Sequence, residues 1–168
     1  MNSKKSVDFM VRTAIVASLY AVLTLSMAPI SYGMIQFRLS EVMTLLAFIN
    51  PIYIAGLTLG TLIANIASQL GAADMVFGTL ATFISVFLVS RSKNIWIASL
   101  WPAIINGIII GSMIYVLGFV PKSLGIWTAI GFVFAGEFVV VTLIGVPVFK
   151  QLIMKHDRLI RMLKGEKF

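Results

Sequence analysis

Three acidic side chains within or beside long apolar runs are the residues of this sequence best placed to do chemistry. Glu137 stands near the middle of the run 125–149, whereas Glu41 and Asp74 lie near the starts of two other runs. A carboxylate in an apolar medium is costly unless it is paired, protonated or facing a wet cavity. We therefore expect Glu137 to bind a ligand or a coupling ion. The structural alternative is a pair with an Asn or Ser of another helix.

Arg38 is the basic residue nearest to these acids. Arg38 and Glu41 are spaced i, i+3, so on a helix they share one face and can pair with each other. The simpler interpretation is an interfacial ion pair without a binding role. Asp74 begins a run directly after a Gly-Ala-Ala segment, where the simpler interpretation is a helix N-cap.

Amide and aromatic side chains in the same regions extend the set of candidate binding residues. Asn106 lies near the middle of the run 95–117, and Asn65 lies in the second half of the run 52–70. Aromatic rings could stack on a flat ligand, although each is equally explained by core packing or by a belt at the membrane interface. The further candidates are Gln36, Gln69, Tyr32, Phe37, Phe77, Tyr115 and Trp127.

Several kinds of catalytic and cofactor site are excluded by what the sequence lacks. It holds no cysteine and a single histidine, His156, near its C-terminal end. Thiolate metal sites, cysteine nucleophiles, H-E-x-x-H zinc sites and histidine-based triads are therefore absent. The sequence also has no G-x-x-x-x-G-K-[ST] loop for ATP. We expect neither an enzyme nor a bound cofactor.

The apolar runs dominate the composition and predict a membrane protein. Apolar residues make up 60% of the 168 residues and charged residues only 11%, against about 25% charged in soluble domains. The sequence therefore predicts one all-α domain embedded in the bilayer.

Runs of about 17–25 mostly apolar residues locate the membrane-spanning helices. We predict six spans, at about 12–28, 35–49, 52–70, 75–90, 95–117 and 125–149. The second is short and carries both Arg38 and Glu41 in its first turns. A re-entrant or strongly tilted geometry is therefore the alternative for this segment.

The positions of the basic residues predict the orientation, because Lys and Arg favour the cytoplasmic side of a membrane. With six spans and the N-terminus inside, eleven of the thirteen basic residues face the cytoplasm, and only Arg38 and Lys122 remain outside. Both termini are thus expected to be cytoplasmic. The basic amphipathic tail, 150–168, is expected to extend the last span or to lie on the anionic inner leaflet. A solvated topology anchor is the alternative.

This orientation places the polar candidates at mid-depth or in the outer half of the membrane. We therefore infer a polar pocket that opens to the outside, as expected of an uptake protein. Pairs of small residues spaced i, i+4 allow helices to approach closely. They are Ala17 and Ala21, Gly56 and Gly60, and Gly107 and Gly111.

Three stretches of the sequence together carry a family resemblance. They contain FRLSE, GAADMVFGTLAT and IASLWPAIINGIIIG, and the first of them begins at Arg12. From about residue 12 to residue 150 the chain resembles the QueT-type family of S components of energy-coupling factor (ECF) transporters. The FRLSE block and the block around DMVFGTLAT are the more specific to that family.

The resemblance implies a six-helix subunit of a prokaryotic cell membrane that captures a queuosine precursor, a 7-deazaguanine base, from outside. It further implies a T subunit and two cytosolic ATPases as partners that drive uptake. In such families an Ala-x-x-x-Ala motif on the first helix contacts the T subunit, which here is Ala17 and Ala21. The absence of an ATP-binding loop from the sequence agrees with ATP binding by separate subunits.

The chemistry of such a base suggests roles for the candidates. A carboxylate of Glu137, Glu41 or Asp74 could accept the ring N–H and the exocyclic amine together, while Asn106 or Gln36 could serve the carbonyl. Three alternatives remain open: an S component for another vitamin-like ligand, a proton-coupled secondary carrier using Glu137, and a membrane subunit without a transport role.

Overall fold

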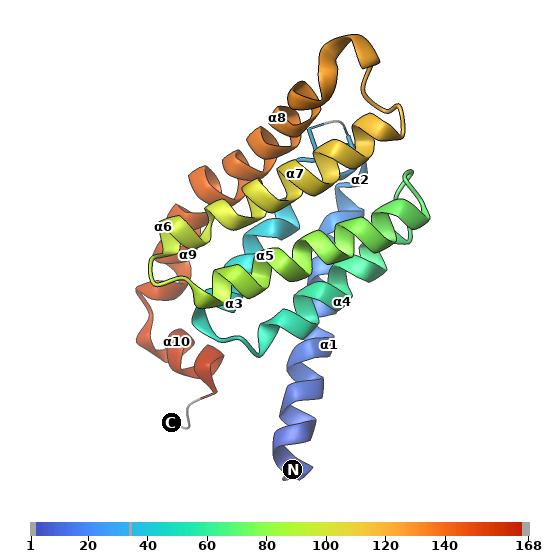
Figure 1. The fold of residues 1–168 in the computed structure, drawn as a ribbon. Coiled ribbons are helices and arrows are strands. Elements are labelled where there is room, and N and C mark those ends of the chain that lie inside the picture. The colour runs from blue at the N-terminus through green and yellow to red at the C-terminus, as the bar shows by residue number, and fades with distance from the viewer. Residues whose placement is uncertain (1–2, 34, 166–168) are drawn as a thin grey trace.

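The computed structural model describes residues 3–33 and 35–165, and their regular structure is helical throughout (Figure 1). η1 and η3 are 3₁₀ helices, and η2, η4 and η5 are π-helical. The elements in chain order are α1 (Ser3–Ser26), α2 (Ala28–Ser31), η1 (Leu39–Leu45), α3 (Leu46–Ile49), α4 (Tyr53–Asn65), η2 (Asp74–Gly78), α5 (Thr79–Arg91), α6 (Ile95–Ala98), α7 (Leu100–Val116), η3 (Lys122–Leu124), α8 (Gly125–Glu137), η4 (Phe138–Gly145), α9 (Val146–Phe149), η5 (Lys150–Met154) and α10 (Asp157–Lys164).

Within residues 3–33 and 35–165, four helical segments are long and apolar enough to cross a membrane. They are Lys5–Ser26, Asp74–Arg91, Ile95–Val116 and Lys122–Met154, and they correspond to the first, fourth, fifth and sixth predicted spans. Helices η2 and α5 continue one another, as do α8, η4, α9 and η5. The prediction of an all-helical chain with several membrane-spanning helices is confirmed at this level.

The second and third predicted spans are shorter helices in the structure. Leu39–Ile49 begins as a 3₁₀ helix, and its eleven residues extend about 20 Å against roughly 30 Å of hydrocarbon. The third was predicted to reach residue 70, but α4 ends at Asn65 and turns follow as far as Gly71, whose φ is +58°. The count of six crossings and the side on which the termini lie stay predictions.

Glycines allow two pairs of helices to pack closely, as the small-residue pairs indicated. A Cβ added at Gly60 of α4 would lie 2.8 Å from Cβ of Tyr20 in α1. A Cβ added at Gly111 of α7 would lie 2.5 Å from Cα of Ile130 in α8. At these positions only hydrogen fits between the helix backbones, so α1 is held against α4 and α7 against α8.

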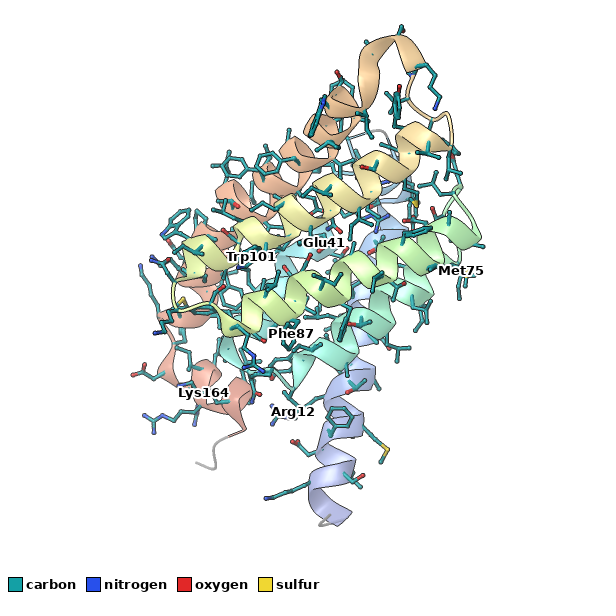
Figure 2. All side chains as sticks on the ribbon, viewed as in Figure 1. Arg12, Glu41, Met75, Phe87, Trp101 and Lys164 are labelled. Carbon is teal, nitrogen blue, oxygen red and sulfur yellow. The ribbon has the colours of Figure 1, made fainter. Side chains whose placement is uncertain are left out.

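The first residues of the tail, η5, continue the last long helix, whereas α10 forms a separate helix docked on the bundle. A turn at Lys155 and His156 precedes α10, so the tail does not extend the last span without interruption. Arg12 donates to the carbonyl oxygens of Met162 and Leu163, at 3.2 Å each, and Asn50 donates to that of Lys164 at 3.1 Å. Arg12 and Lys164 therefore lie at the same end of the molecule (Figure 2).

This contact brings the beginning of α1 and the end of α10 to one end of the bundle (Figure 1). A chain that starts and finishes at the same end crosses the bundle an even number of times. The arrangement is thus compatible with the predicted placement of both termini on one side of the membrane.

Candidate functional site

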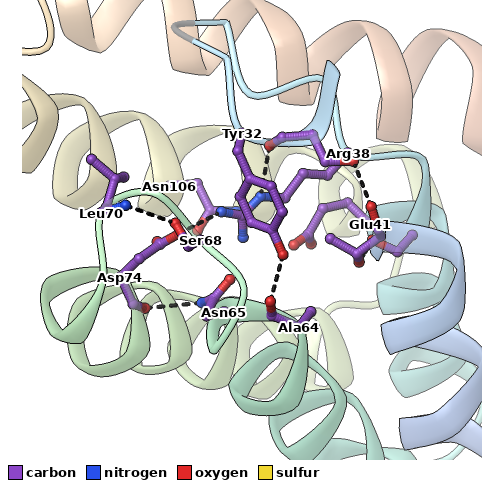
Figure 3. A network of polar contacts seen from close by, with 12 residues as sticks. Tyr32, Arg38, Glu41, Ala64, Asn65, Ser68, Leu70, Asp74 and Asn106 are labelled. Carbon is purple, nitrogen blue, oxygen red and sulfur yellow. Dashed lines mark hydrogen bonds and ion pairs between the residues drawn. The ribbon is translucent and has the colours of Figure 1, made fainter. Parts of the chain in front are cut away.

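Six polar side chains from distant parts of the sequence meet inside the bundle. Each is at most 4% exposed, and Figure 3 labels all of them except Glu137. Arg38 comes from the extended residue just before η1, Glu41 from η1, Asn65 from the end of α4, Asp74 from the start of η2, Asn106 from α7 and Glu137 from the end of α8. We call these six residues the polar cluster. All of them are among the candidates that the sequence indicated.

Arg38 pairs with Asp74 and not with Glu41, the partner that the i, i+3 spacing suggested. Its guanidinium donates to Oδ2 of Asp74 at 3.0 Å and to the carbonyl oxygen of Ser31 at 3.2 Å. The spacing argument fails because Arg38 precedes η1 with extended backbone, at φ −95° and ψ 101°, and is therefore not on the helix. The ion pair joins two segments 36 residues apart and is buried inside the protein.

Asp74 does not act as a helix N-cap. It is the first residue of the π-helical turn η2, and its side chain turns inward to Arg38. Its backbone carbonyl accepts a hydrogen bond from Nδ2 of Asn65 at 2.9 Å. Gly78, one turn later, lies against both side chains, since an added Cβ there would be 2.6 Å from Asn65 Nδ2 and from Asp74 Oδ1.

Glu41 is held by a residue that the sequence analysis missed. The hydroxyl of Tyr20, on α1, donates to Oε1 of Glu41, and both residues are fully buried. Next to this bond, the hydroxyls of Thr24 and Ser40 lie 2.6 Å apart. Only the three-dimensional arrangement reveals this role, because a tyrosine in an apolar run is ordinarily a packing residue.

Glu137 is bonded to the amide of Asn106, which donates from Nδ2 to Oε1 at 3.0 Å. The structural alternative, a pair with an Asn of another helix, is therefore present for one oxygen only. Gly136 allows the carbonyl of Ile35 to come close to α8 beside Glu137. The π-helical segment η4 follows directly, and such turns often occur at functional sites.

Four oxygens of the polar cluster accept no hydrogen bond from the described residues. They are Oε2 of Glu41, Oδ1 of Asn65, Oδ1 of Asp74 and Oε2 of Glu137. No buried side-chain nitrogen of the described residues is without a partner, whereas five buried hydroxyls outside the cluster are, those of Thr13, Thr58, Thr79, Thr82 and Ser85. Buried polar atoms are nearly always paired. The cluster is therefore complementary to a ligand that supplies several hydrogen-bond donors.

Electrostatic interactions connect the cluster as a whole. Arg38 lies close enough to interact with the charges of Asp74, Glu41 and Glu137, and Glu41 and Glu137 also interact with each other. One guanidinium thus interacts electrostatically with three carboxyl groups and forms an ion pair with that of Asp74. Since Asp74 already neutralises Arg38 at 3.0 Å, Glu41 and Glu137 leave the cluster with an excess of acidic groups.

The remaining candidates divide between the cluster and the outside of the bundle. The ring of Tyr32 lies 5.3 Å from the Arg38 guanidinium, and its hydroxyl donates to the carbonyl of Ala64 at 2.5 Å. Gln36 is buried and has a φ of +53°, a conformation that residues other than glycine seldom adopt. Phe77 and Trp127 are 48% and 80% exposed, which fits membrane-facing residues and not a ring stacked on a buried ligand.

Three other candidates do not belong to the polar cluster. Phe37 is half-buried in an apolar group near Leu45 and Val140. Gln69 is exposed. Tyr115 packs its ring beneath the ammonium group of Lys122, at 4.3 Å.

A comparison with protein families matches residues 10–154 to the model of the QueT transporter family. The chain belongs to this family. The family match covers every residue of the polar cluster, and the predicted family resemblance is confirmed. The family is one of transporters, and the long apolar helices of this chain fit a membrane protein.

A curated relative carries the same family name. The queuosine precursor transporter QueT of Lactococcus lactis subsp. cremoris (strain MG1363) is 41% identical over 100 residues, which are 56% of this chain and 58% of the relative. The match thus spans less than two thirds of the relative's length. No solved structure matches the chain.

Proposed function

We propose that this chain is the substrate-binding S component of an energy-coupling factor transporter and captures a queuosine precursor, a 7-deazaguanine base, from outside the cell. The observation that carries the proposal is the set of four buried acceptor oxygens without a donor, on Glu41, Asn65, Asp74 and Glu137. Family membership supplies the class of cargo, since the curated relative is named for queuosine precursors.

A 7-deazaguanine base matches these acceptors. Its pyrimidine edge presents a ring N–H beside an exocyclic amine, and its pyrrole ring presents another N–H. A carboxylate accepts two parallel N–H groups well, and hydrogen bonds to buried charges are the strong ones. We propose Glu137 as the carboxylate that accepts hydrogen bonds from the pyrimidine edge of the base. Asn106 and Gln36, both buried, are the amides that we propose for the base carbonyl.

The excess of acidic groups favours a cationic form of the ligand. Glu41 and Glu137 interact with each other while Arg38 is paired with Asp74. A protonated aminomethyl group on the base would lie between carboxylates and relieve their repulsion. A neutral substituent such as a nitrile would leave that repulsion in place.

Binding to the purified chain tests the proposal directly. We expect 7-aminomethyl-7-deazaguanine to bind in detergent without ATP or an ion gradient, and to bind at least about tenfold more tightly than 7-cyano-7-deazaguanine, because one buried charge pair is worth more than about 1.4 kcal/mol. Isothermal titration calorimetry measures both. No heat with either base would refute the substrate assignment, whereas equal affinities would refute the preference for a cation alone.

The energy for uptake is proposed to come from partners. The sequence holds no ATP-binding loop, so a T subunit and two cytosolic ATPases would drive release to the cytoplasm. Ala17 and Ala21, the predicted T-subunit contact, are 2% and 5% exposed, and Ala17 lies against Gly60 of α4. A T subunit would therefore have to engage α1 beside this face or displace α4 from it.

Liposome uptake separates the proposal from a secondary carrier. We expect the chain alone to bind the aminomethyl base but to accumulate none, with or without a proton gradient. Adding a T subunit and ATPases with ATP should give uptake, measured with radiolabelled base. Accumulation by the chain alone under a proton gradient would favour the proton-coupled carrier instead.

A further inference from the structure

Tyr20 forms a hydrogen bond to one of the two carboxylate oxygens of Glu41. Its hydroxyl donates to Oε1 of Glu41, and Oε2 then accepts no hydrogen bond from the described residues. Both side chains are fully buried, so water does not compete freely for this bond. A fixed carboxylate with one free oxygen is a preorganised acceptor, which loses little freedom when a ligand binds.

Tyr20 also belongs to the face of α1 that packs on α4. Ala17, Tyr20, Ala21 and Thr24 occupy positions i, i+3, i+4 and i+7, which share one face of a helix, and all four are buried. Gly60 of α4 faces this surface, where an added Cβ would lie 2.8 Å from Tyr20 Cβ and 2.9 Å from the Ala17 carbonyl oxygen. The position of Tyr20 is therefore set by how closely α1 lies on α4.

We propose that Tyr20 is a positioning residue for ligand binding: it holds Glu41 with Oε2 turned to the ligand, and the close contact of α1 with Gly60 keeps it in place. This inference rests on the proposed function. It adds a structural connection between the α1–α4 contact and the polar cluster. The α1 face that carries Ala17 and Ala21 is thereby joined to Glu41 through the Tyr20 hydroxyl, next to the contact between Thr24 and Ser40.

The decisive variant is Tyr20→Phe, which removes the hydroxyl and keeps the ring. We expect the Kd for 7-aminomethyl-7-deazaguanine to rise about 10- to 100-fold, as for the loss of a hydrogen bond to a charged group. Tyr53→Phe is the matched control. Tyr53 is also buried on the adjoining helix, and its hydroxyl donates at 2.8 Å to the Leu163 carbonyl in the tail, away from the cluster. We expect the Kd of the Tyr53→Phe variant for the same base to stay within about twofold of the Kd of the parent chain.

Two further readouts distinguish positioning from general loosening of the bundle. In a Glu41→Leu background, Tyr20→Phe should change the Kd by less than about twofold, because the residue it positions is gone. Tyr20→Phe should also reduce the preference for the aminomethyl base over the cyano base. A structural defect alone would weaken both bases equally and would persist in the Glu41→Leu background.

Glycine variants test the same connection without touching the hydroxyl. Gly60→Ala places a methyl against Tyr20, whereas Gly56→Ala places one against Thr13 and Val16, at 3.0 Å. Both crowd α1 against α4, but only Gly60→Ala should weaken binding about tenfold or more. Equal losses in the two glycine variants would overturn the inference.

The tyrosine variants separate failure of the inference from failure of the proposed function. A parent chain that binds the base and a Tyr20→Phe variant with an unchanged Kd would overturn the inference and leave the proposed function standing. Absence of binding by the parent chain would overturn the proposed function and the inference together.

Discussion

Replacing Glu137 by glutamine is expected to weaken binding of 7-aminomethyl-7-deazaguanine by about 100-fold or more. Glutamine keeps an oxygen for the Asn106 amide, which lies 3.0 Å from Oε1 of Glu137. It replaces the free Oε2, however, with an NH₂ group that opposes the donors of the base. Loss of a charge-assisted hydrogen bond and the resulting donor–donor contact together exceed about 3 kcal/mol. Calorimetric titration of the purified variant measures the effect.

The control for this substitution is Asp157→Asn, an acid-to-amide change on the exposed α10. It should leave the Kd unchanged. The Glu137→Gln variant should unfold at a temperature no lower than the parent, because it removes a buried charge. An unaltered Kd for Glu137→Gln would move the base-binding edge to Glu41 or Asp74.

Replacing Arg38 by leucine is expected to destabilise the protein by about 3–5 kcal/mol, the cost of removing one partner of a buried ion pair. Asp74 is fully buried and 3.0 Å from the Arg38 guanidinium, so its carboxylate would lose its counter-ion in an apolar interior. The remaining acids, Glu41 and Glu137, would also lose the single positive charge near them. Unfolding in mixed detergent micelles with a denaturing detergent measures the free energy.

The double variant Arg38→Leu with Asp74→Leu should recover most of the stability, because two apolar groups replace a pair whose desolvation is costly. Ligand binding should not recover, since Asp74 supplies one of the free oxygens. Arg91→Leu, at an exposed arginine, is the control and should cost less than about 1 kcal/mol. A loss below about 1 kcal/mol for Arg38→Leu alone would mean that the cluster is well hydrated.

The sequence was a good guide to which polar residues meet inside the bundle and a poor guide to their partners. The high cost of polar groups in apolar runs was enough to select Arg38, Glu41, Asp74 and Glu137, and all four meet in the interior. The same reasoning expected Arg38 to lie on a helix with Glu41, whereas extended backbone at Arg38 directs it to Asp74. The i, i+3 argument applies only to two residues within the same helix, and η1 begins at Leu39, after Arg38.

The sequence by itself determined the class of the molecule, the four long apolar helices and the family, because these depend on composition and on blocks of adjacent residues. Tertiary structure alone decided that Tyr20 bonds Glu41, that Asn106 bonds Glu137 and that Gly60 lies against Ala17. Each of these contacts depends on how far one helix is rotated and shifted along another. The rotation and shift of each helix follow from packing across the whole bundle, and they cannot be predicted from a short stretch of sequence.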